Sequence, residues 1–307
     1  MKQTLSFLTV LFLLTACGGS STDGGASQSA DSVVVRVAVL PTLDCLPLYL
    51  ASDHGMFQRA GINISLVDFT AQMDCDTAFA NGSIEAMATD LVRLEWLQRQ
   101  KVSSDILTTT DASWKLYTSR NSRIRQLRQL DDHMLAMTRY SATDMLAELV
   151  VDSARLQEER VFRIQVNDVA IRLNMIQNSL VDAALLAEPQ ATAARNVKVL
   201  ELLDASDRFD LRLGVVAARN NTISSEQKKA FEQAYNEACD SLNEHGLQAY
   251  GDMLMIRMNV TAQTVDSLPE KYVFHHVGMP RQKDLDRVKN WMKEKLEKED
   301  VEKQPIQ

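Results

Sequence analysis

Short apolar runs alternate with amphipathic stretches from residue 33 to residue 219. The apolar runs are rich in branched side chains and end at glycine, proline or polar residues, a pattern that predicts buried β-strands. We expect these strands at residues 33–40, 62–69, 84–89, 106–110, 114–118, 133–138, 162–168, 183–187 and 212–219, and we assign no element to residues 198–203. The stretches between them predict helices at 46–60 (with an end near residues 54–55), 74–81, 91–100, 141–151, 169–178 and 189–195, and a short polar helix or turn at 126–131. A mainly helical region is expected at 224–298. Strands that alternate with helices predict an α/β protein with parallel sheets.

Two segments in different halves of the chain repeat one pattern. Residues 81–90 read NGSIEAMATD, and residues 178–186 read NSLVDAALL. In each segment the end of a helix is followed by a turn, an acidic residue (Glu85 or Asp182) and a strand of small residues. A repeated unit of this kind predicts two similar α/β lobes.

The start of the chain has the pattern of an export signal. The apolar run at residues 5–14 follows a lysine and is too short to span a bilayer as a helix of the mature protein. The run ends in LTAC at 14–17, which resembles the lipobox of bacterial lipoproteins. We therefore expect residues 1–16 to be a signal peptide, Cys17 to carry the lipid, and the Gly- and Ser-rich residues 17–32 to form a flexible tether. The alternative is an ordinary signal peptide with an incidental cysteine.

Charge and composition argue against several classes of function. The net charge is −8, which disfavours nucleic acid as a partner. After the signal, no apolar run approaches the length of a membrane span. The five histidines include the adjacent pair His275-His276, and none stands at a metal-binding spacing from cysteine or aspartate. We therefore expect no metal site. We also expect no cofactor and a monomeric protein.

Three cysteines follow the one at the lipobox. A disulfide can persist outside the inner membrane, and Cys45 and Cys75 both follow predicted strands at the same edge of a sheet. These two residues are the candidates for a bridge, which would join two loops. The alternative is three buried thiols, which are common in protein cores. Cys239 lies in a predicted helix and is expected in the core.

Several motifs occur in an order that is typical of one family. Residues 47–51 (PLYLA) and 54–62 (HGMFQRAGI) follow the first strand, and residues 76–85 (DTAFANGSIE) follow the second. Residues 180–189 (LVDAALLAEP) complete the series. Over residues 33–220 the chain resembles the type II solute-binding proteins of ABC importers, in particular the group that binds nitrate, sulfonates, taurine and thiamine pyrimidine precursors.

The resemblance implies a type II periplasmic-binding-protein fold, in which two α/β lobes joined by two crossing strands close on a ligand. It places the first lobe at residues 33–112 plus 213–307 and the second at residues 113–212. It also implies a protein that is not an enzyme but captures a small polar solute and delivers it to an ABC permease, lipid-anchored to the cell membrane and facing the periplasm. Two alternatives stay open: an enzyme of this fold related to thiamine pyrimidine synthesis, whose cysteine-rich iron site the chain lacks, and a sensor lipoprotein without transport.

The loops that follow the strands are expected to form the binding site. Ligands of open parallel sheets bind beyond the carboxyl ends of the strands, where helix N-termini offer free N–H groups. Hydroxyls there could hold a polar edge of the ligand, a guanidinium could pair with an anion, and aromatic faces could stack on a flat ring. The candidate ligand-binding residues are Asp44, Cys45, Gln72, Asp74, Asp90, Trp114, Arg139, Tyr140, Ser141, Thr143 and Glu188.

The expected rim is rich in acids, namely Asp44, Asp74, Asp90 and Glu188. A pocket for a bare anion such as nitrate should avoid this excess of negative charge. The sequence therefore favours an amine-bearing, heteroaromatic or zwitterionic solute, such as a thiamine-precursor-like or sulfonate-like compound. Each acid also has a structural alternative as a helix cap or a surface residue, and Arg139 could equally form a surface ion pair.

Overall fold

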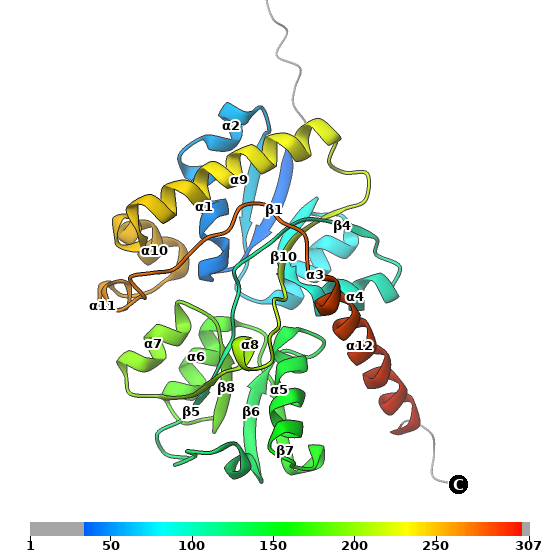
Figure 1. Ribbon diagram of the computed structural model, residues 1–307, viewed down its shortest axis with the longest axis vertical. Coiled ribbons are helices and arrows are strands. Elements are labelled where there is room, and N and C mark those ends of the chain that lie inside the picture. The colour runs from blue at the N-terminus through cyan, green and yellow to red at the C-terminus, as the bar shows by residue number, and fades with distance from the viewer. Residues whose placement is uncertain (1–33, 303–307) are drawn as a thin grey trace, which may run out of the picture. The chain divides into compact units, whose positions relative to one another are not determined.

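The computed structural model describes residues 34–302, which form two lobes, each built on one five-stranded sheet (Figure 1). The signal peptide, the tether and the lipidation of Cys17 that the sequence predicts lie outside the described residues. In the first lobe the strand order is β2-β1-β3-β10-β4. Its strands are β1 (Val35–Val39), β2 (Ile64–Asp68), β3 (Ala86–Asp90), β4 (Ser104–Thr109) and β10 (Gly214–Arg219).

Helices of the first lobe follow its strands in the order that the pattern predicts. They are the short 3-10 helix η1 (Leu43–Cys45) and the helices α1 (Leu46–Asp53), α2 (Met56–Ala60), α3 (Gln72–Asn81) and α4 (Leu91–Arg99). The helix expected at 46–60, with an end near residues 54–55, is divided there at Gly55, whose φ of 67° is a left-handed conformation that glycine adopts without strain. Helix α9 (Ser225–His245) packs on α1 and α2, where Phe231 stacks on Phe57 with ring centroids 5.9 Å apart.

The second lobe has the strand order β7-β6-β8-β5-β9. Its strands are β5 (Lys115–Thr118), β6 (His133–Met137), β7 (Val161–Gln165), β8 (Ala183–Leu186) and β9 (Leu200–Asp204). Its helices are η2 (Leu127–Leu130), α5 (Ala142–Ser153), η3 (Glu158–Arg160), α6 (Val169–Gln177), α7 (Gln190–Asn196) and α8 (Ala205–Arg208). Ser141 caps α5, because its hydroxyl accepts a hydrogen bond from the N–H of Thr143 at 3.1 Å.

The repeated sequence pattern corresponds to a repeated topology. The two repeated segments contain β3 and β8, and each of these strands occupies the third place in its sheet. The predicted likeness of the two lobes is therefore confirmed. The expectation of parallel sheets holds only in part, since β10 is antiparallel to β3 and β4, and β5 is antiparallel to β8 and β9. These are the strands that the chain enters from the other lobe, so no crossover helix within the lobe sets their direction.

The chain passes between the lobes twice, through residues 110–114 and 205–213. Neither crossing is a strand: the first is irregular, and the second contains α8. The N–H of Trp114 donates to the hydroxyl of Ser206 at 2.9 Å, and the carbonyl of Trp114 accepts from the N–H of Ala205 at 3.0 Å. These bonds hold the two crossings side by side.

Gly214 lies where the second crossing enters β10. A Cβ atom at this position would lie 2.2 Å from Thr110 Oγ1 and 2.5 Å from Ala112 Cβ. The carbonyl of Gly214 also accepts a hydrogen bond from the N–H of Thr110 at 2.9 Å. The close approach of the two crossings thus depends on a residue without a side chain.

The region predicted to be mainly helical contains an irregular stretch at residues 267–281. Around it lie α9, η4 (Leu247–Tyr250), α10 (Gly251–Met258), α11 (Ala262–Asp266) and α12 (Gln282–Glu302). Helix α12 packs on α4 of the first lobe and extends towards α5 of the second (Figure 1). There Lys295 Nζ lies 3.1 Å from Asp144 Oδ1 and 2.5 Å from Glu148 Oε1, both on α5. Helix α12 therefore connects the two lobes along one side.

None of the described helices is long and apolar enough to cross a membrane.

The cysteines of the described chain are buried free thiols, so the predicted bridge between Cys45 and Cys75 is wrong. The physical reason is their placement on helices rather than on two facing loops. Cys45 ends η1 and its sulfur accepts a hydrogen bond from the hydroxyl of Thr42, whereas Cys75 lies inside the first turn of α3 and packs in the core. Burial raises the pKa of the Cys75 thiol to about 12. Cys239 is buried in α9, as predicted.

Candidate functional site

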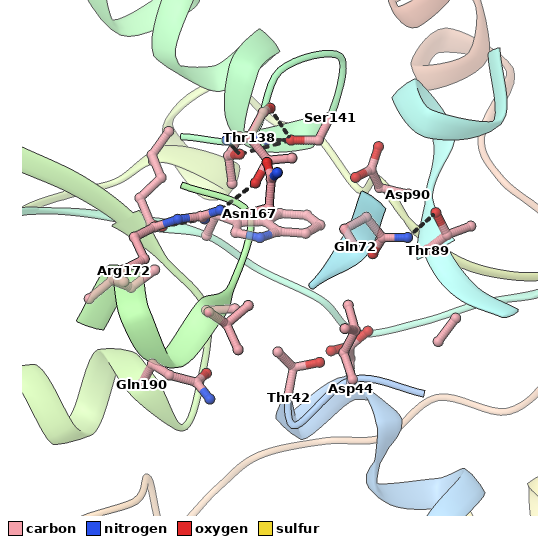
Figure 2. A pocket seen from close by; sticks show the side chains of 18 of the residues that line it. Thr42, Asp44, Gln72, Thr89, Asp90, Thr138, Ser141, Asn167, Arg172 and Gln190 are labelled. Atoms are coloured by element: carbon pink, nitrogen blue, oxygen red, sulfur yellow. Dashed lines mark hydrogen bonds between the residues drawn. The ribbon is translucent and has the colours of Figure 1, made fainter. Parts of the chain in front are cut away.

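A cavity of about 70 Å³ lies where the strand ends of the two lobes meet (Figure 2). Its wall is built mainly from residues at or just beyond the carboxyl ends of β1, β3, β6, β7 and β8, with the N-terminal parts of α3 and α6. Its polar lining consists of Thr42, Asp44, Gln72, Thr89, Asp90, Thr138, Ser141, Thr143, Asn167, Arg172 and Gln190. The remaining lining residues are Leu40, Cys45, Ala88, Trp114, Val169, Leu185, Leu186 and Ala187.

Arg172 is the one cation among the described residues that line the cavity. Its side chain extends from α6 and is 5% exposed. Nε and Nη2 donate to the carbonyl of Val166 at 3.1 and 2.7 Å, Nη1 donates to the carbonyl of Leu185 at 3.1 Å, and Nη2 donates to Thr138 Oγ1 at 2.5 Å. All of these acceptors are neutral. In the part of the chain that the structure describes, no carboxylate oxygen lies within 4.0 Å of this guanidinium.

A chain of hydroxyl groups fixes the loop beside Arg172. The hydroxyl of Ser141 donates to the carbonyl of Thr138 at 2.6 Å, and Thr143 Oγ1 accepts from the N–H of Thr138 at 2.9 Å. The hydroxyls of Ser141 and Thr143 lie 2.8 Å apart. Because Thr138 in turn accepts from Arg172, the guanidinium and the N-terminus of α5 form one rigid wall of the cavity.

The first lobe presents carboxyl and amide groups to the same cavity. Figure 2 shows Asp90, Gln72 and Thr89 on the side opposite Arg172, with Thr42 and Asp44 below. Asp90 is the last residue of β3. Its carboxyl accepts a hydrogen bond from the N–H of Arg93 at 2.9 Å and so caps α4. Asp44 Oδ2 accepts from the hydroxyl of Thr110 at 3.0 Å. Neither acid has a lysine or arginine nitrogen within 4.0 Å among the described residues.

Burial perturbs the charged groups of the cavity. It raises the pKa of Asp90 to about 7, although backbone N–H groups near the carboxyl, including that of Ala142, oppose the shift. It also raises the pKa of Asp44, against hydrogen bonds from Thr42 and Thr110. The same desolvation lowers the pKa of Arg172 to about 10. Buried titratable groups with shifted pKa values in a cleft are typical of functional sites.

The two lobes contact each other at the edges of the cavity. The N–H of Leu43 donates to the carbonyl of Glu188 at 2.8 Å, and Gln190 Nε2 donates to the carbonyl of Pro41 at 2.7 Å. The N–H of Val169 also donates to the carbonyl of Thr70 at 3.2 Å. The lobes therefore enclose the cavity between them.

Four of the candidate residues from the sequence lie outside the cavity lining. Asp74 is exposed, because α3 begins two residues earlier than predicted and turns this side chain outwards. Arg139 forms an ion pair with Glu299 on α12 at 2.8 Å. Tyr140 stacks on Trp96 of α4 with ring centroids 4.0 Å apart and donates its hydroxyl hydrogen to Glu299 at 2.6 Å.

The fourth is Glu188, which is buried but serves the local structure. Its Oε2 accepts from the N–H of Thr192 at 2.9 Å, and its Oε1 lies 3.5 Å from Arg195 Nη2. The carboxylate thus stabilises the start of α7 instead of lining the cavity. The other candidates (Asp44, Cys45, Gln72, Asp90, Trp114, Ser141 and Thr143) line the cavity.

Sequence reasoning missed Arg172, which dominates the electrostatics of the site. One signal was available: the predicted helix at 169–178 carries a single cation among apolar neighbours, directly after Asn167-Asp168 at a strand end. It missed Gln190 as well, whose position immediately after Pro189 indicated a helix start.

Comparisons with known proteins support the fold. No family model matches the sequence, and no curated protein sequence matches it either. Among solved structures, the periplasmic aliphatic sulphonate binding protein SsuA from Escherichia coli is 17% identical with a TM-score of 0.72, over 85% of this chain and 87% of that one. The alkanesulfonate-binding protein SsuA from Xanthomonas axonopodis pv. citri, bound to MOPS, is 16% identical with a TM-score of 0.74, over 86% and 93%. The periplasmic nitrate-binding protein NrtA from Synechocystis PCC 6803 is 12% identical with a TM-score of 0.66, over 83% and 75%.

The chain has the periplasmic binding protein fold. Its two similar sheets and its two crossings agree with the expected type II architecture, although neither crossing is a strand. In a periplasmic binding protein fold the ligand site is expected between the lobes, and the cavity around Arg172 lies at that place.

Proposed function

We propose that the chain is an extracytoplasmic solute-binding lipoprotein. It captures a small polar solute with an anionic group between its lobes and delivers that solute to an ABC permease in the inner membrane. Cys17 anchors the monomeric protein through lipid, with the two-lobed body facing the periplasm. The neighbours in fold are named for binding sulfonates and nitrate, and this supports binding rather than catalysis.

The observation that carries the proposal is the buried guanidinium of Arg172, which has no carboxylate oxygen within 4.0 Å among the described residues, although the charge of Asp168 acts on it from further away. Removing a charge from water is costly unless the charge is paired, and the acceptors around Arg172 are all neutral. A guanidinium has five N–H donors, and its four bonds to described residues leave one of them available. An anionic group of a ligand beside Arg172 would supply the missing charge and the missing acceptor.

The lobes provide the means of capture and release. A few hydrogen bonds join the lobes at the cavity edges, and contacts of α4 and α12 join them along one side. Residues 110–114 and 209–213 of the two crossings are irregular chain that can absorb a change of backbone angle. Opening at these edges would expose the cavity, and closure on a solute would exclude water from Arg172 and strengthen its attraction for an anion. The closed body is the form that a permease would recognise.

Native mass spectrometry of the protein purified from its own host tests the proposal. We expect a co-purified small solute that dissociates on unfolding, and we expect Arg172→Met to lose it. Arg195→Met is the matched control, because Arg195 lies on α7 with its side chain 36% exposed and outside the cavity lining. Circular dichroism would establish that both variants are folded. A wild-type protein that never carries a solute, or an Arg172→Met variant that retains it, would contradict the proposal.

The lipid anchor needs a separate test. We expect Cys17→Ser to yield a protein that no longer partitions with membranes at the processed mass. A variant that remains in the membrane fraction at that mass would show that another feature anchors the chain.

A further inference from the structure

The second lobe carries a cluster of cations at its end farthest from the cavity. Strand β5 runs away from the cavity, since its first residue, Lys115, pairs with Leu186 of the cavity lining. Its last residue, Thr118, pairs with Ala183 at the start of β8. The segment 119–130 that follows therefore lies at the far end of the sheet, towards the lower end of Figure 1. This segment contains no acid and four exposed arginines, namely Arg120, Arg123, Arg125 and Arg128.

Two neighbouring segments belong to the same end of the lobe. The residues just before β9 lie there, because Leu200 of β9 pairs with Thr118. The residues just before β8 lie there too, because residues 177–179 line one groove with Arg120 and Arg123. We call this surface the basic tip. It comprises the exposed cations Arg120, Arg123, Arg125, Arg128 and Lys198 and the exposed aliphatic side chains of Leu180 and Val197.

The cations of the basic tip are not neutralised by the protein. In the part of the chain that the structure describes, no carboxylate oxygen lies within 4.0 Å of any of them. Asp182 accepts a hydrogen bond from the N–H of Met134 at 2.9 Å, and Asp131 pairs with Arg160. Ile124, between the arginines, is buried in the core and fixes the segment. The guanidinium groups are therefore held at a fixed surface, where they can donate to an external anion.

The charge of the basic tip is opposite to that of the whole chain. The net charge is −8, so an anionic surface repels most of the molecule, whereas the basic tip attracts it. Surfaces that rest on membranes combine arginine or lysine with aliphatic side chains, since the cations meet the phosphates and the aliphatic groups enter the headgroup region. The basic tip has both, because Leu180 is 58% and Val197 is 45% exposed.

The proposed anchor keeps such a surface within reach. Residues 18–33 separate Cys17 from the two-lobed body, and at about 3.3–3.6 Å each they reach at most about 55 Å. A compact body of this many residues has a diameter of about 50 Å. The basic tip can therefore touch the membrane that holds the lipid, and tethering makes even a weak attraction effective. A soluble acidic protein has no such advantage, so the observations favour a lipid surface.

Going beyond solute capture, and resting on the proposed anchor at Cys17, we propose that the basic tip binds the anionic headgroups of the membrane to which the chain is tethered. The guanidinium groups donate to headgroup phosphates, and Leu180 and Val197 enter the headgroup region. The tether holds the first lobe and the basic tip holds the second. The body therefore lies along the membrane instead of extending away from it.

Quenching of a dye at the basic tip tests this proposal. The dye is attached to the full chain through Asn121→Cys at an exposed position, and the other cysteines of the described chain are buried. The chain is placed on vesicles with nitroxide-labelled headgroups, made either of phosphatidylcholine alone or of equal parts of phosphatidylcholine and phosphatidylglycerol. We expect quenching at least about threefold stronger on the anionic vesicles. This excess should disappear at about 1 M salt, where the Debye length is about 3 Å.

Two triple variants separate the basic tip from the net charge. The first removes three cations of the basic tip: Arg120→Gln, Arg123→Gln and Arg128→Gln. The second removes three exposed lysines of the first lobe, each without a carboxylate oxygen within 4.0 Å among the described residues: Lys229→Gln, Lys271→Gln and Lys289→Gln. One cation near an anionic surface contributes about fivefold in binding, so the first variant should lose the anionic excess and the second should keep most of it. Both should keep the co-purified solute, since neither change touches the cavity lining.

The outcomes separate this inference from the proposed function. Equal quenching on the two kinds of vesicle, or an arginine variant that keeps the anionic excess, would overturn the proposal and leave a soluble acidic partner as the alternative. A lysine variant that loses the excess as completely would overturn it too, because net charge would then be the cause. Chain added to preformed vesicles gives the same comparison without the lipid. The anchor is judged separately by Cys17→Ser, and capture is judged by the co-purified solute.

Discussion

Lys295 provides a quantitative test of how α12 joins the lobes. Its ammonium group is 7% exposed and lies 3.1 Å from Asp144 Oδ1 and 2.5 Å from Glu148 Oε1. Trp291, also on α12, donates from Nε1 to the second oxygen of Glu148 at 2.6 Å. Burial raises the pKa of Glu148, but its contacts with Lys295 and Arg163 outweigh burial and leave that pKa below its usual value. The structure therefore depends on the cation to keep Glu148 charged, whereas burial leaves the pKa of Asp144 raised despite the same cation.

We expect Lys295→Met to lower the free energy of unfolding at about pH 7 by about 3 kcal/mol. Removing one partner of a buried ion pair costs about 3–5 kcal/mol, since the remaining charge is left uncompensated. The lower end applies here because Arg163 still contacts both Asp144 and Glu148. The matched control is Lys298→Met, whose pair with Glu158 is exposed and should contribute no more than about 1 kcal/mol.

Urea unfolding of the wild type and both variants, followed by circular dichroism, gives these differences directly. The depressed pKa of Glu148 contributes stability that is present above its unfolded value of about 4.5 and is lost as pH falls through the folded value. Lys295→Met removes part of this contribution, so its cost should shrink at about pH 4. A Lys295→Met variant within about 1 kcal/mol of the wild type at neutral pH, or one whose cost does not change with pH, would refute the reasoning.

Three further predictions concern the hinge, the cleft and the core. Gly214→Ala should lower stability by about 1–3 kcal/mol, because its new Cβ would lie 2.2 Å from Thr110 Oγ1, whereas Gly251→Ala meets no contact closer than 3.5 Å and should be nearly neutral in calorimetry. The raised pKa of Asp90 means that the folded state favours the protonated carboxyl. This preference contributes to the free energy of unfolding, in full below about pH 3.8, and the contribution is lost as pH rises through about 7. Asp90→Asn, which keeps a good helix cap, should therefore reduce the fall in stability across that range in urea titrations, and an unchanged pH profile would exclude the shift. Phe231→Ala should lower stability by about 3–5 kcal/mol, because this buried ring packs in the core of the first lobe, and a loss below about 1 kcal/mol would contradict that packing.

Local patterns determine how much of the fold could be predicted from the sequence. Nine of the ten described strands were expected from their apolar runs, whereas no element was assigned to residues 198–203, most of which lie in β9. The repeat at residues 81–90 and 178–186 predicted two similar lobes. The antiparallel direction of β10 and β5 could not be predicted in this way. It depends on how the chain returns from the other lobe, which no local pattern records.

The candidate site was predicted in part for a similar reason. Loops after strands were expected to line it, and Asp44, Asp90 and Ser141 do line the cavity. Tyr140 could not be placed, because a backbone turn with φ of 53° directs the loop between Thr138 and Ser141, and α12 supplies a distant partner for its hydroxyl. Arg172 was missed because its hydrogen-bond acceptors belong to Val166, Leu185 and Thr138. These residues are far apart in the sequence and are brought together only by the folded sheet.

A crystal structure of the protein purified with its own solute tests the central claim most directly. We predict density for a small molecule in the cavity between the lobes, with an anionic group within hydrogen-bonding distance of the Arg172 guanidinium. Density for the solute at another place, or a solute in this cavity with no acceptor facing Arg172, would contradict the claim that this buried cation is the anchor for capture.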